Sequence, residues 1–230
     1  MWPRQSGHYR GEMTLSEQLA ERAAQGRTNL PQATQEMYQR ALADLDASGV
    51  AERVLREGAT APDFELPDAV GETIRLSDLL RSGPVILSFY RGQWCPFCNL
   101  ELRALQQAME EIESAGATLV AVSPNTPDNS MTLVEKHGLT FPVLSDHDNR
   151  VAKQFNLVYE MTAENIDNYR EKGRDVAAMN GSDKWELPLP ATYVIDRDRV
   201  IRYAFVDTNH RVRAEPSDVV RVAAGLAVRP

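Results

Sequence analysis

The feature that most constrains the fold is a strand, a helix and a second strand that follow one another in the middle of the chain. Residues 84–90 are a short apolar run rich in residues that favour β-structure, which is typical of a buried strand. From residue 99 to about residue 115, apolar residues recur every three or four positions, as in an amphipathic helix. Residues 117–123 are a second apolar run, of the kind buried on both faces of a sheet. A helix between two such strands predicts a right-handed crossover and parallel pairing.

The only two cysteines of the chain, Cys95 and Cys98, lie at the turn between the first strand and the helix. Unpaired N–H groups and the helix dipole favour anions at a helix N-terminus, so we expect a thiol pKa below the ordinary value of about 8.5. A structural disulfide would close too short a loop to stabilise the fold much, and a zinc site would have to recruit histidines. Inert packing of the two thiols is a further alternative, but the motif favours redox chemistry.

Composition restricts the compartment and the class of partner. The 230 residues include 33 acidic and 25 basic ones, a net charge of −8, which argues against a nucleic-acid partner. Hydrophobic residues make up 43% of the chain, enough for a core, yet no run approaches the roughly 18 apolar residues of a membrane span. The first residues lack the apolar core of a signal peptide, so we expect a cytoplasmic protein without a membrane partner. The sequence shows no cluster of metal ligands and no glycine-rich phosphate loop, so we expect neither a metal nor a cofactor.

The chain divides into an extension, a main domain and an insertion. Residues 1–57 are predicted to form a helical N-terminal extension that covers the main domain, contacts a second copy or helps to bind substrate. The main domain spans residues 58–230 and ends with a β-hairpin at residues 191–206 and a helix capped by Ser217. Residues 157–187 are predicted to be a helical insertion, whose apolar residues serve ordinary packing or wall a substrate pocket or dimer interface.

Several stretches of the main domain resemble the peroxiredoxin-like branch of the alkyl hydroperoxide reductase/thiol-specific antioxidant (AhpC/TSA) family. They are Gly58–Leu66, Phe89–Glu101, Val120–Pro124 and Phe141–Asp146. The resemblance implies an α/β chain of the thioredoxin-like fold, with a central mixed sheet flanked by helices. It also implies a thiol-dependent peroxidase that reduces hydroperoxides to water or alcohol, and a possible homodimer.

The resemblance assigns roles to residues around the two cysteines. In the peroxiredoxin register, Cys98 is the peroxide-attacking residue and Glu101 is the acidic residue that follows it. Cys95 would condense with the Cys98 sulfenic acid, and an external dithiol would reduce the disulfide, with thioredoxin, glutaredoxin or glutathione as the reductant. Arg91, in place of the family's proline, could stabilise the thiolate and pair with Glu101, or it could be a solvated arginine. Alternatively, Glu101 could interact only with the positive end of the helix dipole.

Departures from the family pattern keep a second chemistry open. Cys95 stands where peroxiredoxins have a threonine or serine hydroxyl, and Pro190 stands where they have an arginine two residues before Thr192. A proline at this place resembles the cis-proline that thioredoxins hold against their Cys-x-x-Cys pair. We therefore expect a cis Leu189–Pro190 bond that faces the cysteines.

The second chemistry is thioredoxin-like exchange between thiols and disulfides. Cys95 would attack a disulfide substrate, and Cys98 would resolve the mixed disulfide. Trp94, Pro190 and Thr192 would bind the substrate, although Trp94 could instead pack over the helix and Pro190 could be an ordinary strand-edge proline. A third alternative is a non-enzymatic binding protein with the same fold, in which the cysteines are idle.

Overall fold

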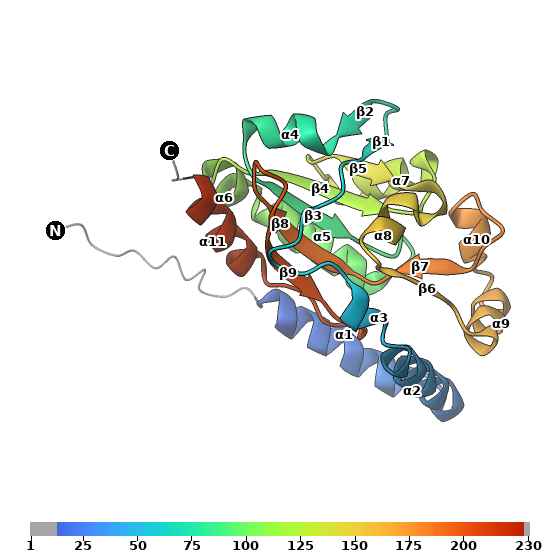
Figure 1. The fold of residues 1–230 in the computed structure, drawn as a ribbon. Coiled ribbons are helices and arrows are strands. Elements are labelled where there is room, and N and C mark those ends of the chain that lie inside the picture. The colour runs from blue at the N-terminus through green and yellow to red at the C-terminus, as the bar shows by residue number, and fades with distance from the viewer. Residues whose placement is uncertain (1–12, 228–230) are drawn as a thin grey trace.

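The computed structural model describes residues 13–227, and its centre is a five-stranded mixed sheet in the order β5-β4-β3-β8-β9 (Figure 1). The strands are β3 Val85–Phe89, β4 Thr118–Ser123, β5 Val143–Ser145, β8 Ala191–Ile195 and β9 Ile201–Val206. β3 pairs in parallel with β4, and β4 pairs in parallel with β5. β8 is antiparallel to both of its neighbours, β3 and β9. The predicted crossover, hairpin and central mixed sheet are therefore confirmed.

Helices cover both faces of this sheet (Figure 1). Side chains alternate along a strand, so Leu87 and Phe89 of β3 enter one core, while Ile86 and the following Tyr90 enter the other. The first core is closed by α3 Val50–Arg53, α4 Leu76–Ser82 and α8 Arg150–Gln154. The second is closed by α5 Pro96–Gln107, α6 Met109–Ser114, α7 Pro127–His137 and α11 Pro216–Ala227. The two cysteines belong to the second core.

The N-terminal extension is helical over its described part and lies against the main domain. Its first two helices are α1 Leu15–Asn29 and α2 Gln32–Ala47. Leu15 and Leu19 of α1 pack against Ala104 of α5. Arg40 of α2 forms an ion pair at 2.7 Å with Glu164 of the insertion. The extension therefore contacts both α5 and the insertion, and its residues 1–12 lie outside the described part.

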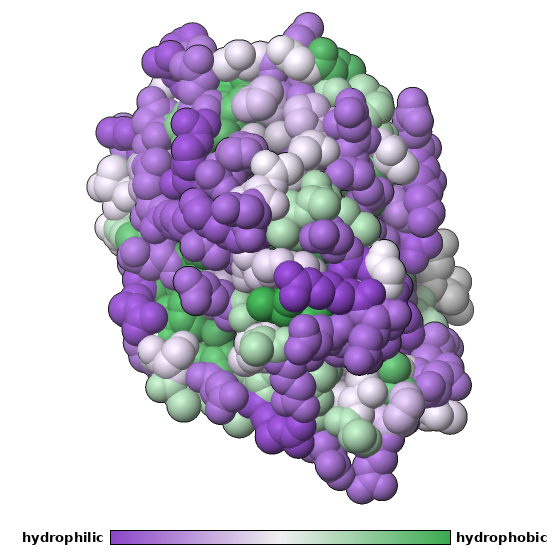
Figure 2. Space-filling view, turned by 90° about the vertical axis from the view of Figure 1, so that its right-hand side faces the viewer, coloured by the Kyte–Doolittle hydropathy of each residue, from purple (hydrophilic) through white to green (hydrophobic). Residues whose placement is uncertain are grey.

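The insertion contains strands as well as helices. Its elements are β6 Val158–Glu160, α9 Ala163–Glu171, α10 Val176–Met179 and β7 Glu186–Pro188. β6 and β7 pair antiparallel and close the insertion at its base. The insertion was predicted as mostly helical, and its two strands were not predicted because three-residue strands are too short to show an alternating pattern. The face that carries α9 and α10 is covered mainly by hydrophilic side chains (Figure 2), while apolar residues of the insertion form a small core beneath it.

Two of the predicted helices begin at a proline. The helix at the cysteines begins at Pro96, so that the cysteines lie at its first turn as predicted, and it is divided at Ala108. The last helix begins at Pro216, so Ser217 lies inside it instead of capping it. Proline suits the first turn because its missing N–H would have had no intrahelical partner.

The remaining elements lie at the edges of the domain. They are the hairpin β1 Glu65–Pro67 with β2 Thr73–Arg75, and the short 3₁₀ helix His147–Asn149. Within residues 13–227, no helix is both long and apolar enough to cross a lipid bilayer.

Candidate active site

A tight turn after β3 places the cysteines at the start of α5. Gly92 has φ +140°, and a Cβ at this position would lie 2.6 Å from the Trp94 indole nitrogen, so glycine is required. The N–H of Gln93 donates to Oδ1 of Asn125 at 2.8 Å and anchors the turn to the end of β4. Cys95 is the N-cap residue of α5. The turn therefore fixes both thiols within the first helical turn.

Cys98 is in contact with a buried arginine from a distant part of the chain. Nη2 of Arg213 lies 3.4 Å from Sγ of Cys98, and its Nε donates to Oε2 of Glu101 at 2.5 Å. The hydroxyl of Thr192 donates to the other Glu101 oxygen at 3.2 Å. The Arg213 and Glu101 side chains are only 1% and 2% exposed. We call these three residues, Glu101, Thr192 and Arg213, the Glu101 cluster.

The Glu101 cluster changes the roles predicted for two residues. Glu101 pairs with Arg213 and not with Arg91, so the predicted Arg91–Glu101 pair was wrong. Thr192 is buried, and its hydroxyl is used to hold Glu101. Arg213 was not predicted as a partner of Glu101 and Cys98. It lies 115 residues from Cys98, and no local pattern distinguishes it from Arg211.

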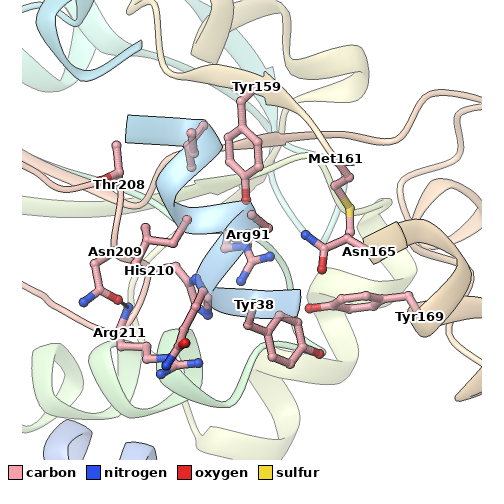
Figure 3. A pocket seen from close by; sticks show the side chains of 14 residues that line it. Tyr38, Arg91, Tyr159, Met161, Asn165, Tyr169, Thr208, Asn209, His210 and Arg211 are labelled. Carbon is pink, nitrogen blue, oxygen red and sulfur yellow. Dashed lines mark hydrogen bonds between the residues drawn. The ribbon is translucent and has the colours of Figure 1, made fainter. Parts of the chain in front are cut away.

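Arg91 lies in a different environment, among aromatic side chains. Its guanidinium carbon is 4.9 Å from the centroid of the Trp94 ring, a cation–π distance. In Figure 3 it points into a cavity between Tyr159, Tyr38 and Tyr169. Within residues 13–227 no carboxylate forms an ion pair with Arg91, and no acceptor lies within hydrogen-bond distance of its Nε.

The two thiols have opposite pKa shifts. Burial raises the pKa of Cys95, but a hydrogen bond from the Cys98 thiol and the charges of Arg91 and Arg213 outweigh burial and lower it to about 5. Burial and the interaction with Cys95 raise the pKa of Cys98 well above its usual value, against the effect of Arg213. Near neutral pH the reduced pair therefore carries one negative charge, on Cys95.

The thioredoxin-like docking surface predicted for the site does not form. Among the described residues every peptide bond is trans, so the prediction of a cis Leu189–Pro190 bond was wrong. Pro190 is buried at the start of β8 and offers no exposed surface. Trp94 is half-buried, and its ring packs edge-on against Tyr169 at a centroid distance of 5.3 Å. The insertion therefore covers the side of the turn on which a partner would dock.

Cys95 borders a cavity of about 400 Å³. The walls come from α1, α2, the end of α9 and the loop before α11. Cys98 is fully buried behind Cys95 and does not line this cavity. The described residues contain no group of three or more His, Cys, Asp or Glu side chains placed to hold a metal ion.

Comparisons with known proteins agree with this architecture. Residues 58–204 match the AhpC/TSA family. The chain belongs to the AhpC/TSA family. Peroxiredoxin Bcp of Escherichia coli (strain K12) is 34% identical over 103 residues, which are 45% of this chain and 65% of that protein. Chloroplastic peroxiredoxin Q of Triticum aestivum is 25% identical over 159 residues, 69% of this chain and 63% of that protein. The chain thus spans less than two thirds of the length of either relative.

A solved structure of the family shows the same fold. The match to the crystal structure of peroxidoxin BcpB from Mycobacterium tuberculosis covers 76% of this chain and 99% of the BcpB chain. Its TM-score is 0.59 and the sequence identity is 24%. The predicted thioredoxin-like α/β fold of the AhpC/TSA family is therefore confirmed. The helices α1 and α2 precede the region that matches the family, so part of the cavity wall at Cys95 is an addition to the family's domain.

Proposed function

We propose that this AhpC/TSA protein is a thiol-dependent peroxidase that reduces hydroperoxides through a Cys95–Cys98 disulfide. The observation that carries the proposal is the contact of Arg213 with Cys98 at 3.4 Å, beside a second thiol that interacts with the first. An arginine at this distance stabilises both a thiolate and the oxygen that leaves when a thiolate attacks a peroxide. The Glu101 cluster holds that arginine in place.

The hydrogen bond between the two sulfurs gives a balanced route for the first step. The Cys98 proton moves to the Cys95 thiolate, and the Cys98 thiolate, next to Arg213, attacks the O–O bond of the hydroperoxide. The bond breaks, Cys98 becomes a sulfenic acid, and the departing alkoxide or hydroxide takes the proton from Cys95. Cys95 is then a thiolate again and an alcohol or water molecule leaves.

The second step forms the disulfide. The Cys95 thiolate attacks Sγ of the Cys98 sulfenic acid, the S–O bond breaks, and the oxygen leaves as water after taking one proton. An external thiol reductant, such as thioredoxin, glutaredoxin or glutathione, then returns both cysteines to the reduced state. Metal and cofactor chemistry has no part in this proposal.

A thiol:disulfide oxidoreductase is the second candidate, because Cys95 rather than Cys98 reaches the cavity. Its pKa of about 5 makes Cys95 a thiolate near neutral pH and a good leaving group. In that function Cys95 attacks the substrate disulfide and Cys98 resolves the mixed disulfide. The buried Pro190 and its trans bond remove the docking surface on which a thioredoxin-like role would depend.

The test separates the two candidates by the sulfur that hydrogen peroxide oxidises. In the Cys95→Ser variant, we expect Cys98 to react with hydrogen peroxide well above the rate of free cysteine and to be trapped as a sulfenic acid by dimedone. In the Cys98→Ser variant, Cys95 should react no faster than a free thiolate. If Cys98 is no faster than free cysteine while the wild type reduces insulin disulfides, the protein is a disulfide oxidoreductase.

A further inference from the structure

The cavity beside Cys95 is strongly basic in an acidic protein. Six of its lining residues are arginine or lysine, and none is aspartate or glutamate. These six are Arg22, Arg27, Arg91, Lys172, Arg174 and Arg211. The whole chain has a net charge of −8, so this concentration of positive charge is local. A concave site lined by one sign of charge attracts ligands of the opposite sign.

The charges of these six residues are not neutralised by the protein. Within residues 13–227, none of the six forms an ion pair with a carboxylate. Some basic residues elsewhere are paired, as in Lys153–Glu186 at 2.6 Å. The basic groups also act on one another: besides burial, the nearby charge of Arg27 lowers the pKa of Arg211. The charge of the cavity therefore favours an anionic ligand.

Arg91, which lines the cavity, is a buried cation whose bonding capacity is only partly used. Arg91 is 5% exposed, and its Nε has no hydrogen-bond partner within the described residues. In Figure 3, which shows an adjoining cavity, its guanidinium lies among Tyr38, Tyr169 and His210, three residues that line both cavities. Burial, followed by the charges of Arg91, Arg213 and Arg211, lowers the pKa of His210 well below its usual value. An unpaired buried guanidinium is costly unless a ligand satisfies it.

The walls of the cavity select for a small ligand. Lys172, after α9, lies 5.8 Å from the ring of Tyr38 in α2, so the insertion and the N-terminal extension meet here. Cys95 is only 1% exposed at the base of the cavity, so a protein reductant cannot reach its sulfur without moving these walls. The volume of about 400 Å³ lies within the range of about 300–1,000 Å³ that is usual for small-molecule sites.

We propose that a low-molecular-weight thiol that carries carboxylate groups binds in this cavity and reduces the Cys95–Cys98 disulfide. The inference rests on the proposed function, because it names the class of reductant for that cycle. Of the two sulfurs, only Cys95 lines the cavity, so Cys95 is the sulfur that the ligand attacks. The carboxylates pair with the arginine and lysine side chains of the walls.

Two molecules of this thiol complete the reduction. The first, as a thiolate, attacks Sγ of Cys95, the disulfide breaks, and Cys98 leaves as a thiolate beside Arg213 and takes up a proton. A second thiolate attacks the ligand sulfur of the mixed disulfide, and Cys95 leaves as a thiolate. The products are the reduced pair and the oxidised ligand dimer, so two electrons pass to the protein and two thiols are oxidised.

The experiment measures the reduction of the oxidised full-length protein, by the change in tryptophan fluorescence or by thiol labelling. The disulfide is prepared with diamide, so the measurement does not depend on peroxidase activity. The probes are glutathione, which carries two carboxylates, and the neutral 2-mercaptoethanol. The variant is Arg27→Gln/Arg174→Gln, and the control is Arg81→Gln on α4, remote from the cavity (Figure 1).

At low ionic strength, we expect glutathione to reduce the double variant about tenfold more slowly than the wild type. The rate of reduction by 2-mercaptoethanol should be the same for both. Arg81→Gln should match the wild type with both thiols. Equal rates of the variant and the wild type with glutathione, or equal slowing with both thiols, would overturn the proposal. So would rapid reduction of the wild type by thioredoxin with none by glutathione.

A further measurement tests whether the cavity binds a charged reductant or a charged oxidant. Reduced protein is oxidised by hydrogen peroxide and by a fatty-acid hydroperoxide, which carries a carboxylate. If the double variant slows oxidation by the fatty-acid hydroperoxide and leaves reduction by glutathione unchanged, the cavity serves the oxidant and the proposal is wrong. If peroxide oxidises no cysteine but glutathione reduction depends on the two arginines, the peroxidase proposal fails while the cavity remains a thiol site.

Discussion

The active site contains two buried arginines that differ in one respect, the presence of a carboxylate. Arg213, behind Cys98, is paired with Glu101 at 2.5 Å. Arg91, beside Cys95, is surrounded by tyrosine and tryptophan rings and forms no ion pair within the described residues. The two arginine residues are comparably buried, at 4% and 5% exposure, so burial does not separate them.

The carboxylate decides what each arginine can do. Burial and the interaction with Cys95 are the main causes of the raised pKa of Cys98, and the negative charge of Glu101, which opposes that of Arg213, adds to them. Arg91 keeps its full charge, which favours the Cys95 thiolate and is available to a ligand in the cavity. Both arginines lower the pKa of Cys95, but only the charge of Arg91 is not offset by a carboxylate among the described residues.

The largest expected effect concerns stability. Arg213→Met leaves Glu101 buried without its partner, and we expect the free energy of unfolding to fall by about 3–5 kcal/mol in urea titrations of the reduced protein. Arg91→Met removes an unpaired charge and should cost much less. Adding Glu101→Gln to Arg213→Met should recover most of the loss. Similar costs for the two single substitutions would show that the arginines are equivalent.

Next in size is the effect of Arg91 on the reactivity of Cys95. In Arg91→Met, we expect the pKa of Cys95 to rise from about 5 toward the ordinary value of about 8.5, because the unpaired positive charge is lost. The absorbance of the thiolate against pH measures this change. Arg170→Met is the matched control, because Arg170 also lies over a tryptophan, Trp185 at 5.1 Å. An unchanged Cys95 pKa in Arg91→Met would assign the shift to Arg213 and Cys98 alone.

A smaller effect is the pH dependence of stability that the Cys95 thiolate produces. Its pKa is lower in the folded state, so its stabilisation is fully present above the unfolded value of about 8.5 and is lost as the pH falls through about 5. Cys95→Ser should therefore reduce the free energy of unfolding more at pH 8 than at pH 5. Urea titrations of the reduced proteins at the two pH values measure the difference. The opposite order would mean that folding raises the pKa of Cys95 instead of lowering it.

The smallest expected effect is the hydrogen bond from Thr192 to Glu101. Thr192→Val should lower the free energy of unfolding by about 1–2 kcal/mol, because a buried carboxylate oxygen loses its donor. Thr192→Ser keeps the hydroxyl and should restore most of that loss. If valine and serine behave alike, Thr192 contributes packing only and the Glu101 cluster is held by Arg213 alone.

The local patterns of the sequence determined the central architecture. Continuous apolar runs specified β3 and β4, and apolar residues at helical spacing specified α5, because burial imposes these patterns on the chain itself. The position of Cys95 and Cys98 at the turn follows from the same segment. The short strands β6 and β7 were missed because three residues cannot show a period.

Only the tertiary structure decided how the cysteines are tuned. From the sequence, the low thiol pKa was expected to come from the helix N-terminus. A backbone N–H of that helix, at Cys98, does lower the pKa of Cys95, but the Cys98 thiol and the charges of Arg91 and Arg213 lower it more. Which arginine meets Glu101 depends on how the segment before α11 folds back over α5. The basic cavity depends on α1, α2 and the insertion coming together. These are contacts between distant segments, and side-chain charge in a sequence does not indicate which charges will meet.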